Sequence, residues 1–134
     1  MARIFLIDKD DSARTVLYLT LAYFGHTVIE ARGLHDGPDL FNHANADLII
    51  ADIVKPEKEG LKFLIKLMQE HPSVKVIAIS GEGLHAAEDL LHTAKLAGTA
   101  KILVKPVSDE AMMAAVNELL LPAGPPARPT PGTK

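Results

Sequence analysis

The sequence has no cysteine and no tryptophan, and only 4% of its 134 residues are aromatic. Without cysteine it can form neither disulfides nor a thiolate metal site, which is typical of a reducing compartment, so we expect a cytoplasmic protein. No apolar run approaches the roughly 20 residues of a membrane helix. Residues 1–3 lead straight into a short strand-like run, so we expect no signal peptide. The net charge is −3. We therefore expect neither a nucleic-acid partner nor a membrane partner.

The chain divides into a body, residues 1–121, and a proline-rich end, residues 122–134. Five of the nine prolines lie in that end, which has no periodic apolar pattern. This composition predicts a flexible tail or the stub of a linker. A body of this length can bury a hydrophobic core without covalent cross-links, so we expect a single domain.

Short apolar runs alternate with helical patterns along the body. The runs predict strands buried on both faces at residues 3–7, 26–30, 47–51, 74–79 and 101–104. Helical spacing and stop signals predict helices at residues 12–24, 59–70, 84–97 and 109–120. A further helix is expected within residues 33–45, starting near Asp36 because Pro38 cannot lie in its middle. Five strands alternating with five helices predict an α/β fold, a doubly wound, five-stranded parallel sheet covered by helices on both faces.

The first predicted helix is unusually apolar. Its spacing predicts a core-facing set made of Val16, Leu17, Leu21 and Phe24. That leaves Leu19 and Tyr23 on an outer face, and exposed apolar residues of this kind often mark an interface. Asp11 or Ser12 is expected to cap this helix, and Ser108 to cap the last one.

Polar side chains follow four of the predicted strands. Asp8 follows the first, Asp52 the third, Ser80 the fourth and Lys105 the fifth. In parallel α/β sheets the carboxyl ends of the strands meet at one edge, where ligands bind. Carboxylates, a hydroxyl and an ammonium group are what is needed to hold a divalent cation and a phosphoryl group. Each residue alone could be an ordinary polar strand end, but their joint occurrence favours a phosphoryl site.

This pattern resembles the receiver domain of bacterial two-component response regulators, of the chemotaxis-regulator type, over about residues 3–121. The matching segments are IFLIDKDDSAR, DLIIADIVKPEKEG, VIAISG and GTAKILVKP. The spacing of Asp52, Pro56 and Gly60, with Lys105 downstream, is specific to that family. The resemblance implies a flavodoxin-like (β/α)5 fold.

The resemblance also implies a role for each site residue. Asp52 would accept a phosphoryl group from a phosphohistidine on a histidine kinase or a histidine phosphotransfer protein. Asp8 and Asp52 would hold Mg²⁺ with the backbone carbonyl of Val54, while Ser80 and Lys105 would contact the acyl phosphate. The implied protein is a stand-alone receiver that signals to an unknown protein target. Pairing of two copies through the last two helices is a further expectation.

One position departs from the family pattern. The family has two adjacent acids after the first strand, and the second of them binds the metal directly. Arg14 and Leu17 fix the alignment to the family, so Lys9 stands at the position of this second acid. Two alternatives follow. In the first, Lys9 pairs with a site carboxylate and displaces Mg²⁺, because opposite charges about 4 Å apart at a partly buried site attract by about 4 kcal/mol. In the second, Lys9 points outward and leaves a weakened metal site that Asp10 partly supports.

Three functions therefore stay open. The first is a phosphorylatable receiver, which is not an enzyme, and we favour it. The second is a degenerate pseudo-receiver, an interaction module independent of phosphorylation because Lys9 disrupts the Mg²⁺ site. The third is a phosphatase of the haloacid-dehalogenase type, since Asp8 and Asp10 after an apolar strand resemble its nucleophile motif. The short chain and the lack of an acidic pair after the lysine strand argue against the third.

Overall fold

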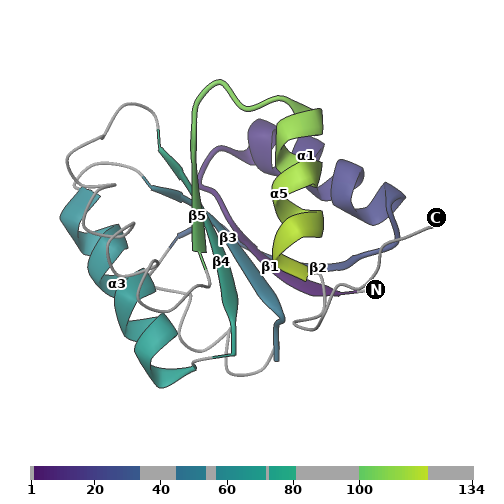
Figure 1. Ribbon diagram of the computed structural model, residues 1–134. Helices are drawn as coiled ribbons and strands as arrows, with labels where there is room; N and C mark the ends of the chain where they lie inside the picture. The colour runs from purple at the N-terminus through teal and green to yellow at the C-terminus, as the bar shows by residue number, and fades with distance from the viewer. Residues whose placement is uncertain (1, 34–44, 54–56, 72, 81–99, 121–134) are drawn as a thin grey trace.

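The structure is a computed structural model that describes residues 2–33, 45–53, 57–71, 73–80 and 100–120 (Figure 1). The helices predicted over residues 33–45 and 84–97, and the predicted tail over 122–134, fall outside these ranges apart from Gly33 and Asn45. Within these ranges, every helix is too short or too polar to cross a bilayer.

The described elements follow one another as the apolar runs predict. In chain order they are β1 (Arg3–Ile7), α1 (Asp11–Tyr23), β2 (Thr27–Ala31), β3 (Leu48–Ile53), α3 (Glu57–Glu70), β4 (Lys75–Ser80), β5 (Ala100–Val104) and α5 (Asp109–Leu120). The strands form one sheet in the order β2-β1-β3-β4-β5, and every neighbouring pair is parallel. The parallel five-stranded sheet is therefore confirmed.

Two helical layers cover the sheet, with α1 and α5 on one face and α3 on the other (Figure 1). Alternate side chains of a strand point to opposite faces, and β1 illustrates this. Phe5 and Ile7 belong to the hydrophobic cluster that includes α3, whereas Ile4 and Leu6 belong to the cluster that includes α1 and α5. Because both faces are covered, a strand needs a continuous apolar run and not an alternating one.

Local signals set the ends of the helices. Gly25 follows α1 with φ of 92°, a conformation that glycine adopts without steric cost. Ser108 caps α5, because its Oγ accepts a hydrogen bond from the backbone N–H of Ala111 at 3.0 Å, as predicted. The cap of α1 was predicted wrongly. It is Asp10, whose Oδ1 accepts from the N–H groups of Ser12 and Ala13.

The burial of α1 differs partly from the prediction. Leu21 is fully buried and Leu17 is partly buried. Val16 and Phe24, predicted to face the core, are 58% and 52% exposed. Phe24 lies past the last turn of the helix, and Val16 is rotated away from the side that Leu21 buries, since five residues on a helix turn through about 500°.

Candidate functional site

Asp8 and Asp52 lie together at the carboxyl edge of the sheet. Among the described residues they are the buried polar ones, each 8% exposed. Asp8 directly follows β1, and Asp52 lies within β3, one residue before its end and not after the strand as predicted. The parallel register pairs Ile7 with Ala51, so the next residue on each strand is one of the two acids. Two adjacent strands therefore bring the two carboxylates side by side.

Lys105 reaches this pair from the end of β5. Its Nζ lies 2.9 Å from Oδ1 of Asp52. The contact is an ion pair without the angles of a hydrogen bond, so this buried oxygen has no hydrogen-bond partner among the described residues. The Lys105 side chain is 48% exposed and that of Asp52 only 5%. The site is therefore a buried acceptor oxygen with a solvent-accessible cation next to it.

The environment of Asp8 disfavours its charge. Burial raises the pKa of its carboxyl above the ordinary 3.8, and the nearby charge of Asp52 raises it further. The hydrogen bond from the Asp10 N–H to Oδ1 of Asp8, 2.9 Å long, and the charge of Lys105 lower the pKa but do not offset burial. At Asp8, burial and the neighbouring acid therefore outweigh the contacts that favour its charge.

We expect Asp8→Asn to stabilise the metal-free protein at pH 7, because it removes a buried charge next to Asp52. An acid whose pKa is raised by folding stabilises the fold fully below its unfolded pKa near 3.8, and this stabilisation is lost as the pH rises through the folded pKa. The charged form of Asp8 therefore opposes folding, while asparagine keeps the acceptor for the Asp10 N–H. Urea unfolding at pH 7 and at pH 3 checks this, with the exposed Asp109→Asn as control. A less stable Asp8→Asn protein at pH 7 would contradict it.

Lys9 is exposed and forms no ion pair with any residue that the structure describes. It therefore pairs with neither Asp8 nor Asp52 in the structure, and its effect on a metal site stays a prediction. Asp10 is also exposed, and its Oδ1 is engaged by the α1 cap. A role for Asp10 as a metal ligand therefore stays a prediction.

Ser80 and Val54 are the two other residues predicted to contribute to the site. Ser80 ends β4, where its backbone is in register with Ile53 of β3 and Val104 of β5, at the same edge as Asp52. Val54 lies outside the described residues. The roles of the Ser80 hydroxyl and the Val54 carbonyl stay predictions.

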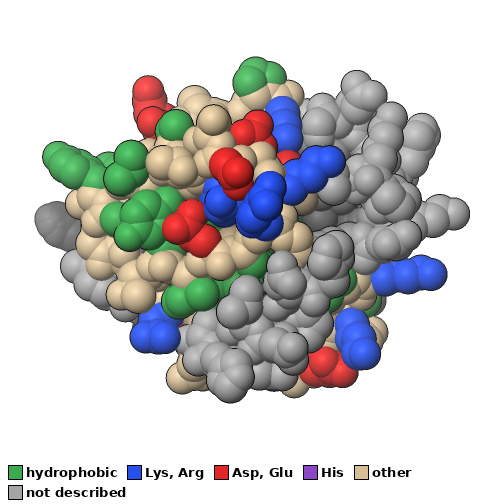
Figure 2. Space-filling model, turned by 180° about the vertical axis from the view of Figure 1, so that it is seen from behind, with side chains coloured by type: hydrophobic (Ala, Val, Ile, Leu, Met, Phe, Trp, Pro, Cys, Tyr) green, Lys and Arg blue, Asp and Glu red, His purple; other side chains and the backbone are tan. Residues whose placement is uncertain are grey.

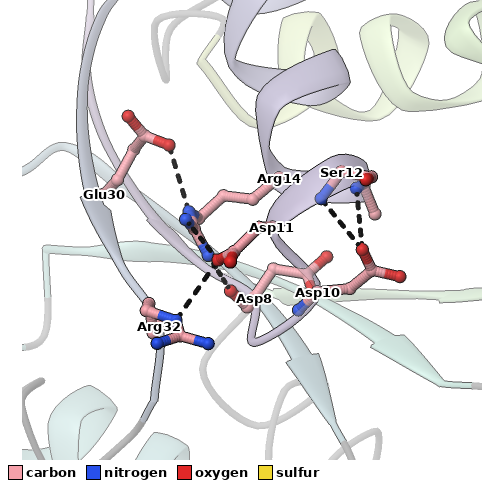
Figure 3. Close-up of polar contacts among 8 residues, drawn as sticks. Asp8, Asp10, Asp11, Ser12, Arg14, Glu30 and Arg32 are labelled. Atoms are coloured by element: carbon pink, nitrogen blue, oxygen red, sulfur yellow. Dashed lines mark hydrogen bonds and ion pairs between the residues drawn. The ribbon is translucent and has the colours of Figure 1, made fainter.

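The structure adds a charged network at the start of α1 that the sequence did not predict (Figure 3). Arg14 bonds Asp11 and Glu30, and Arg32 pairs with Asp11 at 3.2 Å. The Arg14 hydrogen bond, followed by the charge of Arg32, lowers the pKa of Asp11. The spacing of Asp11 and Arg14 on a helix could have indicated their pairing. Glu30 and Arg32 are distant in the sequence and reach this network only because β2 pairs with β1.

The donor set at the carboxylate pair fits Mg²⁺. This ion prefers carboxylate, carbonyl and water oxygens, and the carboxylates of Asp52 and Asp8 are such donors, although Oδ1 of Asp52 is already paired with Lys105 in the metal-free chain. A divalent charge would also relieve the repulsion between the two acids. The described residues contain no group of three acidic or histidine side chains that could hold a metal. The remaining ligands would have to be water and backbone oxygens.

The chain matches the response regulator receiver domain family over residues 4–117 and belongs to this family. Receiver domains are non-catalytic signalling modules of two-component systems, and the match covers residues 4–117 of this chain. Members of the family typically bind Mg²⁺ and interact with histidine kinases.

Three relatives give the range of proteins in which such a domain occurs. Protein PilH of Pseudomonas aeruginosa is 27% identical over 122 residues, which cover 90% of this chain and 98% of PilH. The sensor kinase CckA of Brucella abortus is 30% identical over 89% of this chain and 12% of its own length. The transcriptional regulatory protein GlrR of Escherichia coli is 27% identical over 92% of this chain, which spans about a quarter of GlrR.

Solved structures show the same fold. A response regulator receiver domain protein from Clostridium thermocellum superposes with a TM-score of 0.76 at 23% identity, over 90% of this chain and 94% of that one. The chemotaxis protein CheY4 of Vibrio cholerae gives 0.74 at 22% identity, over 90% and 99%. The flavodoxin-like fold predicted from the sequence is confirmed.

Proposed function

We propose that this receiver accepts a phosphoryl group on Asp52 from a phosphohistidine of a histidine kinase or a histidine phosphotransfer protein. The observation that carries the proposal is the buried Oδ1 of Asp52, which has no hydrogen-bond partner among the described residues and lies 2.9 Å from Nζ of Lys105. A buried carboxylate oxygen without a hydrogen bond is available as a nucleophile, and the nearby cation can offset the incoming negative charge.

The transfer would form one bond and break one. An Oδ of Asp52 attacks the phosphorus, the oxygen–phosphorus bond forms, and the phosphorus–nitrogen bond breaks with its electron pair going to the donor imidazole. Lys105 would then pair with a phosphoryl oxygen, and the Ser80 hydroxyl would donate a hydrogen bond to another. Mg²⁺ held by Asp8, Asp52 and the Val54 carbonyl would supply further positive charge beside the phosphoryl oxygens.

The outer surface of α1 suits a protein donor. Residues 15–29 contain no Asp, Glu, Lys or Arg, and Leu19 and Tyr23 are 59% and 84% exposed, as predicted. Figure 2, seen from behind, shows hydrophobic side chains gathered on the side of the molecule where α1 lies. Contiguous exposed apolar side chains mark protein interfaces. We propose that the helical bundle of the phosphodonor docks here.

Leu19→Glu is expected to slow phosphoryl transfer from an autophosphorylated histidine kinase at least about tenfold, because it puts a charge into an apolar interface. Labelling by acetyl phosphate, which needs no docking, should stay unchanged. Gln69→Glu adds the same charge on an exposed position of α3, on the other face of the sheet, and should affect neither reaction. Equal slowing with both donors would place the effect in the fold and not in docking.

The test of the proposed function is the intact mass of the protein after incubation with acetyl phosphate, with and without Mg²⁺. A Mg²⁺-dependent gain of one phosphoryl group supports the proposal. No gain under any condition would favour the alternative, a pseudo-receiver that acts by contacts alone. The exposed position of Lys9 and the pairing of Asp52 with Lys105 argue for the phosphorylatable form.

The output of the receiver would be a protein contact, in the cytoplasm, with a target that recognises the phosphorylated surface. PilH, which this chain matches over 98% of its length, is an example of a relative that consists almost wholly of such a domain. The predicted pairing of two copies would use residues 84–97, which lie outside the described residues.

A further inference from the structure

The side chain of Arg14 lies under the acidic turn between β1 and α1, and it is only 13% exposed. Its guanidinium makes three contacts through its three nitrogen atoms (Figure 3). Nη1 donates to the backbone carbonyl of Asp8 at 2.7 Å, Nη2 to Oδ1 of Asp11 at 2.8 Å, and Nε to Oε1 of Glu30 at 3.1 Å. Two carboxylates from different elements therefore fix the orientation of the group that binds Asp8.

The main chain of Asp8 is held on both sides. Its N–H donates to the carbonyl of Ala31 at the end of β2, at 3.1 Å, and its carbonyl accepts from Arg14. Its carboxylate is then oriented by the N–H of Asp10, which donates to Oδ1 at 2.9 Å. Without the Arg14 contact, the peptide that follows Asp8 would lose the anchor on its carbonyl side, and the carboxylate would lose its fixed direction.

We propose that Arg14 is a positioning residue that holds the Asp8 carboxylate in place at the site edge. Its role at the Mg²⁺ site rests on the proposed function, whereas its effect on the turn does not. The planar guanidinium presents donors in a fixed fork, which a lysine cannot reproduce at three acceptors at once. Groups that orient a metal-binding carboxylate commonly contribute about 10–100-fold to metal affinity when they are removed by mutation.

The test compares Arg14→Ala with Arg32→Ala in the full chain. Arg32 pairs with the same Asp11, at 3.2 Å, but it is 70% exposed and its recorded contact is with that carboxylate and not with Asp8. Two quantities are measured. One is the hydrogen-exchange rate of the Asp8 and Asp10 amides by NMR in metal-free protein, and the other is Mg²⁺ affinity by calorimetry.

Arg14→Ala should speed exchange of the Asp10 amide at least about tenfold relative to core amides of β3 and β4, and should weaken Mg²⁺ binding about tenfold. Arg32→Ala should change neither quantity, and Arg14→Lys should fall between alanine and wild type. Unchanged exchange at Asp8 and Asp10 in Arg14→Ala overturns the proposal. A uniform rise of exchange across β3 and β4 overturns it too, since Arg14 would then act only on global stability.

The two proposals can fail separately. Wild-type protein that binds no Mg²⁺ contradicts the proposed metal site, while the exchange rates in metal-free protein still judge Arg14. Should Arg14→Ala fail to fold, Glu30→Gln loosens the guanidinium and leaves its contact with Asp8 possible. That variant should speed exchange of the Asp10 amide by a smaller factor, of about twofold to fivefold, and no change overturns the proposal.

Discussion

Asp52→Asn is expected to abolish phosphoryl uptake, with the mass gain reduced at least about 100-fold from that of the wild-type protein. The amide is nearly the same size as the carboxylate, so the substitution keeps the shape of a side chain that is 5% exposed. What it removes is the anionic oxygen next to Lys105, and an amide cannot form the acyl phosphate. The measurement is intact mass after incubation with acetyl phosphate and Mg²⁺.

The same variant has a second, independent signature. The charge of Asp52 raises the pKa of Asp8, so removing that charge should lower the pKa of Asp8 measured by NMR. Asp109→Asn, an exposed acid in the first turn of α5, is the matched control and should keep full uptake. Phosphoryl uptake that persists in Asp52→Asn would mean that another residue is the acceptor, and the proposed role of Asp52 would be wrong.

The sheet could be predicted from the sequence because its strands are buried on both faces. In β1 the four residues after Arg3 are apolar and buried, and β1 has the predicted bounds. Other ends shifted by a residue or two. β3 runs on to Ile53 although Asp52 interrupts the apolar run, because backbone pairing with β4 continues through Ile53. Hydrogen bonding between strands is not visible in the composition of one strand.

The two errors in α1 concern its cap residue and its buried side. Local sequence patterns show neither the exact residue where a helix starts nor which of its sides faces the sheet. Asp8, Asp10 and Asp11 all suit a helix start, and only the geometry shows that Asp10 accepts from the second and third N–H groups of the helix. Val16 is apolar but exposed. Apolar residues cover more than one stripe of this helix, so hydrophobic spacing alone could not say which stripe faces the sheet.

The sequence predicted the site residues that lie at strand ends, but it did not predict the side-chain network that supports them. Asp8 and Asp52 are adjacent because β1 and β3 are in register, and the strand order of the family fold implied this. The Arg14 network depends on Glu30 of β2, which is 16 residues from Arg14 in the sequence. No spacing rule connects Glu30 to Arg14, so the support of the Asp8 turn became visible only in the structure.

Lys9→Asp is expected to raise Mg²⁺ affinity about tenfold or more. Lys9 is exposed and adjacent to Asp8, so its charge opposes a cation at the carboxylate pair without filling the site. At roughly 8 Å in water a pair of unit charges interacts by about 0.5 kcal/mol. Lys9→Asp changes the side-chain charge by two units, and the ion carries two, so the interaction energy changes by four times this amount, or about 2 kcal/mol. Dissolved salt reduces this energy by screening. Calorimetric titration with Mg²⁺ at two salt concentrations measures it.

Lys9→Asp both removes a positive charge and adds a carboxylate that could bind the metal. Lys9→Ala removes the charge alone and so separates these two effects. Removing the charge alone should give about half of the free-energy gain, roughly threefold to fivefold in affinity, with the same dependence on salt. A new aspartate that binds the metal directly would add affinity that salt does not screen. Equal affinity in all three proteins would rule out any electrostatic role for Lys9. A wild-type protein that takes up no phosphoryl group, next to a Lys9→Asp protein that does, would mean that Lys9 keeps this receiver silent and that it acts by contacts alone.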